Sequence, residues 1–334
     1  MAIKAAIIGL GRIGSLLEED RLREKPCTHA GAITAVPGLE LCAGADINQE
    51  RCDLFAEKWQ VPVYTDAQTM LQKEQPAILH IATHPDSHWH YCSLAKRYGV
   101  SAVVCEKPLA DTLSGAKKIA ALHNSGGITI ITNHERRYAA DYTQAQQILA
   151  DGKTLGPIQA VRGTLYMGKG RRLLDVLWHD GTHLADAAMF LSGAVLKHRK
   201  TLNAKKLKDN TGTVYLLGHL DKPAVPAISP LPFLLELGGG RDHLAFELEI
   251  SCEWGKLLIG NGIFEVWESR ESPYAEGFKS LEKITDGFAQ PTGYFSAMAA
   301  DALNCAVHKN HKPLSSANDG LRVIQYLHSI RSWH

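Results

Sequence analysis

The 334-residue chain lacks a CxxC pair, an excess of one charge sign, a fixed-period repeat and a long apolar run. Its seven cysteines are odd in number and widely scattered, which favours reduced thiols and a cytoplasmic protein over a disulfide-bonded secreted one. No stretch approaches the roughly 18 apolar residues of a membrane-spanning helix, so no membrane partner is expected. The 36 basic and 35 acidic side chains nearly cancel, so no global field attracts nucleic acid. The composition favours a small molecule as the partner.

Three glycines form a motif near the N-terminus. The apolar run Ile3–Ile8 leads into Gly-Leu-Gly-Arg-Ile-Gly, and apolar residues then follow at helical spacing. This pattern predicts a buried strand, a tight turn and the start of a helix. In a GxGxxG motif the first glycine makes the turn, the second admits a pyrophosphate, and the third lets the helix pack against the strand. Helix N–H groups would face the anion. An unliganded turn is the alternative to dinucleotide binding, for which the predicted residues are Gly9, Gly11, Arg12, Ile13 and Gly14.

An acidic residue follows the second predicted strand, Leu39–Ala45. Asp46 stands where a carboxylate commonly accepts hydrogen bonds from the adenosine ribose. Its charge would repel a 2′-phosphate, which favours NAD over NADP. The distance from Gly14 is longer than the usual spacing of about 20 residues, and the polar segment Glu18–Thr28 explains the excess. A simple turn residue is the alternative role for Asp46.

Helix-like and strand-like segments alternate through the first part of the chain. Helices are expected at Glu50–Trp59, Gln68–Lys73 and Thr112–Asn124, and strands at Val61–Tyr64, Ala77–Thr83, Ser101–Cys105 and Ile128–Thr132. This alternation predicts an α/β fold with a doubly wound parallel sheet. Cofactors bind at the C-terminal ends of such strands. The residues predicted there are Thr83, His84, Pro85, His88, Glu106 and Lys107.

The order of GxGxxG, Asp46, Thr83-His84-Pro85 and Glu106-Lys107-Pro108 resembles the glucose-fructose oxidoreductase, inositol dehydrogenase and MocA family. The stretches 179–186 and 313–316 extend the resemblance over nearly the whole chain. It implies a Rossmann domain, expected over residues 1–127. An α/β domain with a large, mostly antiparallel open sheet, for substrate binding and oligomerisation, is expected over residues 128–334. It also implies hydride transfer between a nicotinamide and a sugar or related polyol.

The same resemblance gives roles to two cations. Lys107 is expected near both nicotinamide and substrate, where an ammonium can stabilise alkoxide character on the reacting oxygen. A surface lysine is the alternative. Arg136 lies in a stretch that corresponds to an Asn/Arg/aromatic cluster near the active site, and we expect it to bind substrate. A solvated pair with Arg137 is equally open.

Strand-like segments dominate the second half of the chain. They are expected at Ile158–Tyr166, Leu196–Leu202, Thr213–Leu217, Phe233–Leu237, Ala245–Ser251, Lys256–Ile259 and Ile263–Trp267, before helices at Tyr294–His308 and Ala317–Ser332. Alternating residues suggest a sheet with one wet or differently covered face. Because an open sheet needs a cover for its apolar side, which another subunit often supplies in related proteins, we expect a homodimer or homotetramer. The cations of Gly168–Arg172 could meet an anionic substrate group, or form a surface loop.

The segment Leu177–Asp186 is the richest in titratable groups. It resembles the family's helix start with a catalytic histidine, here His183. An imidazole can take a hydroxyl proton as hydride leaves the same carbon; a packing or capping role is the alternative. Relatives often have an aspartate four residues earlier, where this chain has His179. His179 is therefore expected to share the catalytic hydrogen bonding and Asp180 to contact substrate, while Asp186 orients His183 or packs the helix.

A metal site is a rival reading of the same residues. His179 and His183 are four residues apart and could share a face with Asp186 as third ligand. Gly181 lies between the histidines and no HExxH is present, so no metal is expected.

The sequence thus predicts an NAD(P)-dependent oxidoreductase that acts on a secondary alcohol or carbonyl of a sugar, cyclitol or sugar derivative. Two alternatives stay open: an NAD-sensing regulator without turnover, and a glycosidase that retains NAD.

Overall fold

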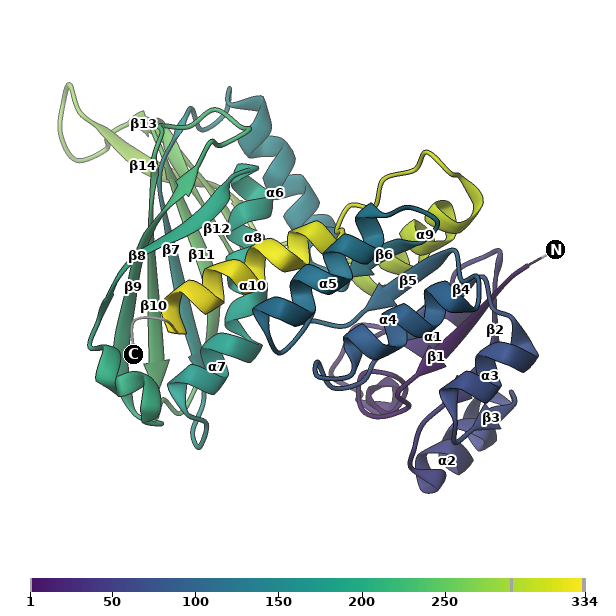
Figure 1. Cartoon of the computed structure of the whole chain (residues 1–334). Coiled ribbons are helices and arrows are strands. Elements are labelled where there is room, and N and C mark those ends of the chain that lie inside the picture. Colours follow the sequence, from purple (N-terminus) through teal and green to yellow (C-terminus); the bar gives the residue numbers. More distant parts are fainter. Residues whose placement is uncertain (1, 289–290, 332–334) are drawn as a thin grey trace. The chain divides into compact units, whose positions relative to one another are not determined.

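The computed structural model describes residues 2–288 and 291–331, in two compact units (Figure 1). Unit 1 comprises residues 1–139 and 291–324, and unit 2 comprises residues 140–290 and 325–334. The boundary expected at residue 127 therefore divides unit 1. Strand β6 (Thr129–Thr132) pairs with β5 (Ala102–Cys105), and helix α9 (Tyr294–Val307) returns to this unit late in the chain. Helix α10 (Ala317–Arg331) passes from unit 1 to unit 2 after Ile324; the expected end at Ser332 lies outside the described residues.

Six parallel strands form the sheet of unit 1 in the order β3-β2-β1-β4-β5-β6. Strands β4 and β5 are buried throughout, as expected where helices cover both faces of a sheet. This strand order is that of the doubly wound Rossmann fold, so the predicted fold class is confirmed. The remaining bounds are β1 Ile3–Ile8, β2 Leu39–Ala45, β3 Val63–Tyr64 and β4 Ile78–Ile81.

Short polar side chains fix where the helices of unit 1 begin. Asn48, Asp66 and Thr112 each accept a hydrogen bond from the amide three residues later, which satisfies a donor at the helix start. Helices α4 and α5 pack against one another, and α1 packs against α9. The bounds are α1 His29–Ala35, α2 Gln49–Trp59, α3 Ala67–Glu74, α4 His88–Arg97 and α5 Leu113–Asn124.

The helix expected directly after Gly14 is interrupted, which corrects the prediction. Residues Ser15–Thr28, here called the insert, contain only a short 3₁₀ helix (Leu16–Glu19), and α1 begins after them. The N–H of His29 donates to the carbonyl of Ile13, and the N–H of Ala30 to that of Gly14, both at 3.0 Å. Helix α1 therefore continues the turn that the glycine loop starts. The insert accounts for the long spacing between Gly14 and Asp46.

Eight strands form the sheet of unit 2 in the order β14-β13-β12-β11-β7-β10-β9-β8. Strand β10 pairs with β7 in parallel and the other neighbours pair antiparallel, so the mostly antiparallel sheet is confirmed. Strand β14 was not predicted, because its alternating polar residues lie on an exposed edge. The bounds are β7 Ile158–Met167, β8 Val195–Leu202, β9 Gly212–Asp221, β10 Leu231–Gly239, β11 Leu244–Cys252, β12 Gly255–Gly260, β13 Ile263–Glu271 and β14 Lys279–Asp286.

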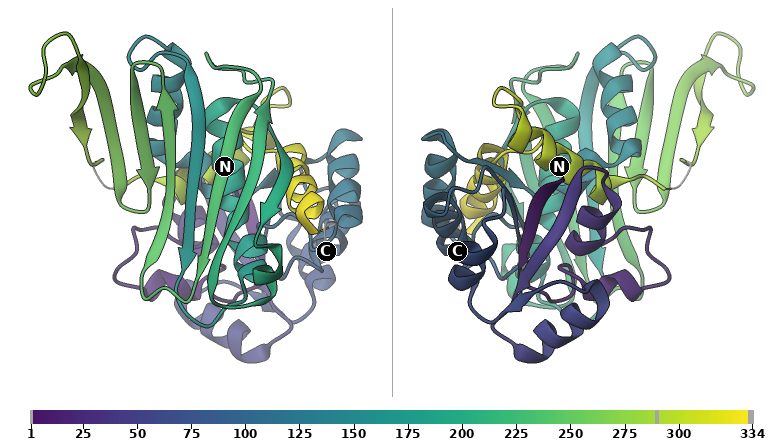
Figure 2. Two further views of the ribbon diagram at one scale, coloured as in Figure 1. Left: turned by 90° about the vertical axis from the view of Figure 1, so that its left-hand side faces the viewer. Right: turned by 90° about the vertical axis from the view of Figure 1, so that its right-hand side faces the viewer.

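Helices of unit 2 itself cover the apolar face of this sheet. Helices α6 (Ala140–Asp151), α7 (Leu173–His179) and α8 (Gly181–Ser192) contact strands β12, β10 and β7 respectively. The other face, turned toward the viewer in Figure 2 (left), carries charged cross-strand pairs, of which Arg162–Glu249 at 3.3 Å and Lys283–Glu265 at 2.7 Å are examples. The cover that the open sheet was expected to need is thus supplied on this face by helices of the same chain.

Every helix among residues 2–288 and 291–331 is too short or too polar to cross a bilayer.

Candidate functional site

Two glycines of the glycine loop are required by close backbone contacts within unit 1. Gly9 has a φ of +93°, and a Cβ there would lie 2.6 Å from the carbonyl oxygen of Ala82. A Cβ on Gly14 would lie 2.1 Å from the carbonyl oxygen of Gly9. At Gly11, by contrast, the nearest atom would be Nη1 of Arg51, at 3.6 Å. The packing of the protein thus leaves room for a ligand to approach Gly11, which fits pyrophosphate binding.

The other predicted residues of this loop differ in exposure. Arg12 is exposed, so its cation is open to solvent, while Ile13 is half-buried and uses its carbonyl to hold α1. We retain both as predicted cofactor contacts, Arg12 through its charge and Ile13 through its backbone.

Asp46 links the end of β2 to the glycine loop. Its Oδ2 accepts a hydrogen bond from the N–H of Leu10 at 2.8 Å, and its Oδ1 accepts from the N–H of Asn48 at 2.9 Å. The side chain is nearly buried, and Nη1 of Arg51 lies 3.5 Å from Oδ2. The acidic group therefore fixes the loop that would hold the pyrophosphate. Arg51 partly neutralises its charge.

The loop after β4 is held by a buried histidine. Thr83 shares a hydrogen bond with Ser87 at 2.7 Å, and His84 is exposed and Pro85 half-buried. The ring nitrogens of His88 face the carbonyl oxygens of Thr83, at 3.1 Å, and Leu109, at 3.2 Å. Burial lowers the pKa of His88. His88 is fully buried and ties two strand-end loops together, so any effect of it on cofactor binding is indirect.

Glu106 directs its carboxylate into the protein. Its Oε1 accepts hydrogen bonds from Nε2 of His29 at 2.9 Å and from Nδ2 of Asn133 at 2.5 Å. Its Oε2 accepts from the backbone N–H of Lys107 at 3.2 Å. Burial raises the pKa of Glu106, but the hydrogen bond from His29, the charge of Lys107 and the hydrogen bond from Asn133 lower it, to a net value below the usual range. Glu106 is therefore a buried anion beneath the half-buried Lys107.

The two adjacent arginines of the 3₁₀ helix Glu135–Tyr138 have different surroundings. Arg137 is nearly buried, donates to the carbonyl of Leu314 at 3.0 Å and lies 3.4 Å from Asp319. A solvated arginine pair is therefore excluded, whereas Arg136 remains half-buried and stays a predicted substrate contact. Burial raises the pKa of the neighbouring Glu135, against the charges of Arg136 and Lys107. No motif in the sequence points to Glu135.

The predicted catalytic stretch of unit 2 is split between two helices. Helix α7 ends at His179 and α8 begins at Gly181, with Asp180 at the junction. The side chain of His179 is 60% exposed, and its Nδ1 lies 3.4 Å from Oδ1 of Asp180. His183 is half-buried and packs edge-on against Phe246, with ring centroids 6.5 Å apart. His183 therefore lies in the first turn of α8, whereas His179 belongs to the preceding helix.

Salt bridges occupy most of the charges around this junction. Arg171 pairs with Asp180 at 2.7 Å, and Arg172 contacts Asp175 through two hydrogen bonds of 2.7 and 3.0 Å. Two of the three cations of the loop 168–172 therefore bind the protein itself, which weakens their predicted contact with an anionic substrate. Asp186 is 1% exposed and lies on the buried side of α8.

One group of potential metal ligands occurs in unit 1, at the end of α9. Ligand atoms of Asp301, Cys305 and His311 all lie within 4.8 Å of one another. Asp301 already accepts hydrogen bonds from His311 at 2.5 Å and from the hydroxyl of Tyr138 at 2.8 Å. Burial raises the pKa of the Cys305 thiol to about 12, which disfavours the thiolate that a metal needs. The hydrogen bonds of this cluster therefore fit a role in anchoring the C-terminal part of α9 better than a role in metal binding.

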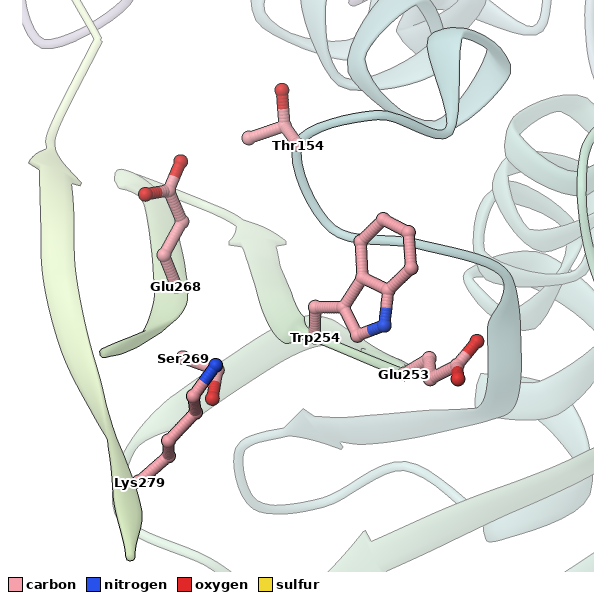
Figure 3. Close-up of a pocket in the computed structure, with 6 residues that line it drawn as sticks. All are labelled: Thr154, Glu253, Trp254, Glu268, Ser269 and Lys279. Atoms are coloured by element: carbon pink, nitrogen blue, oxygen red, sulfur yellow. The ribbon is translucent and has the colours of Figure 1, made fainter. Parts of the chain in front are cut away.

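A hollow of about 550 Å³ opens in unit 2 near the turn between β11 and β12 (Figure 3). It contains none of the residues predicted from the sequence. Trp254 is 48% exposed there, and Figure 3 shows it beside Thr154 and Glu253. The lining residues are Thr154, Glu253, Trp254, Glu268, Ser269 and Lys279.

Sequence reasoning missed two histidines in the core of unit 1. His29 and His80 are both fully buried, and their Nδ1 atoms lie 2.8 Å apart. A histidine between leucine and isoleucine in a fully buried parallel strand is the signal that could have drawn attention to His80.

Much of unit 1 is similar in sequence to a known protein family. Residues 3–134 match the model of the GFO_IDH_MocA family, described as an oxidoreductase family with an NAD-binding Rossmann fold. The chain is 28% identical to D-apiose dehydrogenase of Paraburkholderia graminis over 180 residues, which are 51% of this chain and 47% of that enzyme. The chain therefore spans about half the length of that relative.

Two further comparisons cover more of the chain. It is 26% identical over 266 residues to the inositol 2-dehydrogenase/D-chiro-inositol 3-dehydrogenase of Shouchella clausii, covering 76% of this chain and 68% of that enzyme. An oxidoreductase from Agrobacterium radiobacter, solved in complex with NAD⁺, L-tartaric acid and magnesium, has a TM-score of 0.72 at 18% identity. That likeness covers 99% of this chain and 96% of the other, and it concerns the fold alone.

Proposed function

We propose that the chain transfers hydride between a nicotinamide cofactor and a secondary alcohol or carbonyl of a sugar, cyclitol or sugar derivative. The proposal starts from the match of residues 3–134 to the GFO_IDH_MocA oxidoreductase family. The observation that carries the proposal is the glycine loop, which is open at Gly11 and braced by Asp46, in the same unit as the Glu106–Lys107 strand end. The sugar-like substrate class follows the names of the relatives.

The glycine loop, Asp46 and the Thr83–Pro85 loop would hold the dinucleotide. When bound, the cofactor supplies or accepts the hydride. Amides near Gly11 would face the pyrophosphate, and a second lone pair on an Asp46 oxygen would accept a ribose hydroxyl. We infer a preference for NAD because a 2′-phosphate would meet the Asp46 carboxylate. Arg51, whose Nη1 lies 3.5 Å from Asp46 Oδ2, reduces that repulsion. We therefore expect NAD to bind more tightly than NADP, with NADP binding weakened and not abolished.

Lys107 is the proposed electrophile. Its ammonium would donate a hydrogen bond to the reacting oxygen and so stabilise negative charge that develops there as the C–H bond breaks. The buried carboxylate of Glu106, which accepts from the Lys107 amide, supports the backbone from which this side chain projects.

His183 is the proposed general base in oxidation and general acid in reduction. The imidazole takes the hydroxyl proton as the alcohol becomes a carbonyl, and returns it in the opposite direction. His179 and Asp180 are proposed to bind substrate hydroxyls beside it, while Arg136 contributes a second cationic contact. These roles rest on the family resemblance of the 179–186 stretch and on the partial exposure of His183.

The direct test is a screen of the NAD-loaded protein against polyols, aldoses and sugar acids for formation of reduced nicotinamide. We expect turnover with at least one polyol or sugar, and a Lys107→Ala loss of about 10²–10³-fold in kcat with NADH binding retained. Full activity of the Lys107→Ala variant would remove this residue from the mechanism. NADH binding without turnover would instead indicate a regulator, and cleavage of aryl glycosides without net NADH would indicate a glycosidase.

We further propose a cytoplasmic homodimer or homotetramer. All seven cysteines are free thiols, which suits a reducing compartment. The support for self-association is the outer edge of β14, together with exposed Tyr274 and Phe278 between β13 and β14. Light scattering after size-exclusion chromatography tests this, and a monomer would contradict it.

A further inference from the structure

A chain of four polar side chains crosses the core of unit 1. His80 of β4 contacts His29 of α1 at 2.8 Å, His29 contacts Glu106 at 2.9 Å, and Glu106 contacts Asn133 at 2.5 Å. Both histidines are 0% exposed and Glu106 is 6% exposed. The ring of His29 also packs edge-on against Phe295, with centroids 5.5 Å apart. These groups come from four segments that are distant in sequence.

The acceptors fix the direction of the hydrogen bonds. An ionised Glu106 can only accept, so Nε2 of His29 carries the proton between them. A doubly protonated His29 would donate to Nδ1 of His80 and leave an unpaired N–H on Nε2 of His80. With a single proton on His29, its Nδ1 instead accepts from Nδ1–H of His80. Nε2 of His80 then bears a bare lone pair, and it has no hydrogen-bond partner among the described residues. An unpaired acceptor is tolerated in a core more readily than an unpaired N–H. Burial lowers the pKa of His80 well below its usual value, in accord with a neutral ring.

Stability alone gives no reason for such a chain. Buried polar networks are often replaced by apolar side chains without loss, whereas a network broken at one member leaves a costly unsatisfied group. The His80–His29–Glu106–Asn133 network differs because it also contacts a predicted catalytic segment: Oε2 of Glu106 accepts a hydrogen bond from the backbone N–H of Lys107. His29 and Asn133 hold Oε1 of the same carboxylate from two sides. The carboxylate plane, and with it the start of the Lys107 segment, is set from within the core.

We propose that His29 and His80 are positioning residues for Lys107: His80 fixes the tautomer of His29, and His29 orients the Glu106 carboxylate that holds the Lys107 backbone. The proposal rests on the proposed oxidoreductase function for its catalytic consequence. Its structural content, one defined proton arrangement in both rings, does not depend on that function.

The first experiment measures the tautomers directly in the full-length protein. Nitrogen-15 NMR of histidine-labelled protein is expected to show His29 protonated at Nε2 and His80 at Nδ1, both neutral at pH 7. The single variants His29→Gln and His80→Asn assign the two sets of signals. A His80 ring protonated at Nε2, or a His29 ring carrying two protons, would overturn the proposed arrangement.

The second experiment separates positioning from stability. His80→Asn retains a donor near the Nδ1 position, whereas His80→Leu removes it. With a substrate from the screen, we expect kcat to fall about tenfold or more in His80→Leu and to stay within about threefold in His80→Asn, with KM for the substrate changed less. Ile33→Ala, a cavity variant one turn later on α1, is the matched control: it should lower Tm without lowering kcat at a temperature where it is folded.

The outcomes distinguish the positioning role of His80 from the proposed oxidoreductase function. Equal kcat in His80→Leu and His80→Asn, or an equal loss in Ile33→Ala, would overturn the positioning role. If no substrate is turned over, the oxidoreductase proposal fails by itself. The tautomers measured by NMR then still decide the inference, because the proposed proton arrangement of His29 and His80 does not depend on turnover.

Discussion

The polar groups of unit 1 and those of the α7–α8 junction in unit 2 are held in different ways. In unit 1, Glu106 accepts three hydrogen bonds and is fixed from within the core. In unit 2, the side chain of His179 is 60% exposed and lies 3.4 Å from the carboxylate of the adjacent Asp180. Side chains locked by a buried network keep one geometry, whereas exposed side chains sample several rotamers. We infer that unit 1 supplies the fixed part of the chemistry and that the α7–α8 junction supplies an adaptable part.

The sharpest test of this comparison lies within unit 2 and contrasts His183 with His179. His183→Ala should lower kcat about 10²–10⁴-fold, because it removes the proposed general acid/base. His179→Ala should change kcat by less than about tenfold, since its exposed ring shares its role with water. Steady-state kinetics with the substrate found by the screen measures both. Equal losses in the two variants would mean that the pair acts as one unit.

A second test contrasts two glycines of unit 1. Gly14→Ala should lower the free energy of unfolding by about 1–3 kcal/mol, because its Cβ would lie 2.1 Å from a backbone oxygen. Gly11→Ala should leave stability nearly unchanged, because the nearest atom to its Cβ would be Nη1 of Arg51 at 3.6 Å, and it should weaken NADH binding by crowding the proposed pyrophosphate position. Thermal unfolding without cofactor and fluorescence titration with NADH give the two readouts. If Gly11→Ala binds NADH normally, the pyrophosphate does not approach there.

The smallest expected effect is a pH dependence from His80. Its pKa in the folded protein is well below 6.5, so the unfolded chain binds a proton that the folded chain does not. The free energy of unfolding should therefore fall as the pH drops below 6.5, by up to about 1.4 kcal/mol per pH unit from this residue. His80→Asn should lose that part of the slope. Denaturant unfolding between pH 7 and pH 5 measures it, and parallel curves for wild type and variant would contradict it.

The fold was largely predictable because glycine spacing and apolar periodicity are local signals. Strand β2 was predicted with its exact bounds at Leu39–Ala45, and the parallel order followed from the βαβ alternation. The interrupted first helix was missed because its continuation depends on Ile13 and Gly14 carbonyls meeting residues after the insert. Strand β14 was missed because an exposed edge strand lacks an apolar pattern.

The candidate site was predictable only where a motif marks it. The Glu106–Lys107 strand end carries a motif, but nothing in the sequence states that Glu106 faces His29 and Asn133, because those partners come from other elements. The roles of Lys107, His183 and Arg136 stay predictions. The helix break at Asp180 escaped notice because Gly181 can continue or begin a helix equally well.

The two hydrogen bonds that rejoin α1 to the glycine loop close the insert at its base. Because these bonds hold the two ends of the insert together, a longer or shorter insert is compatible with the same axis of α1 and the same shape of the glycine loop. Chain length at this point is thereby uncoupled from the geometry of the sheet. Evolution or protein engineering could use such a position to add contacts beside the glycine loop without rebuilding the fold.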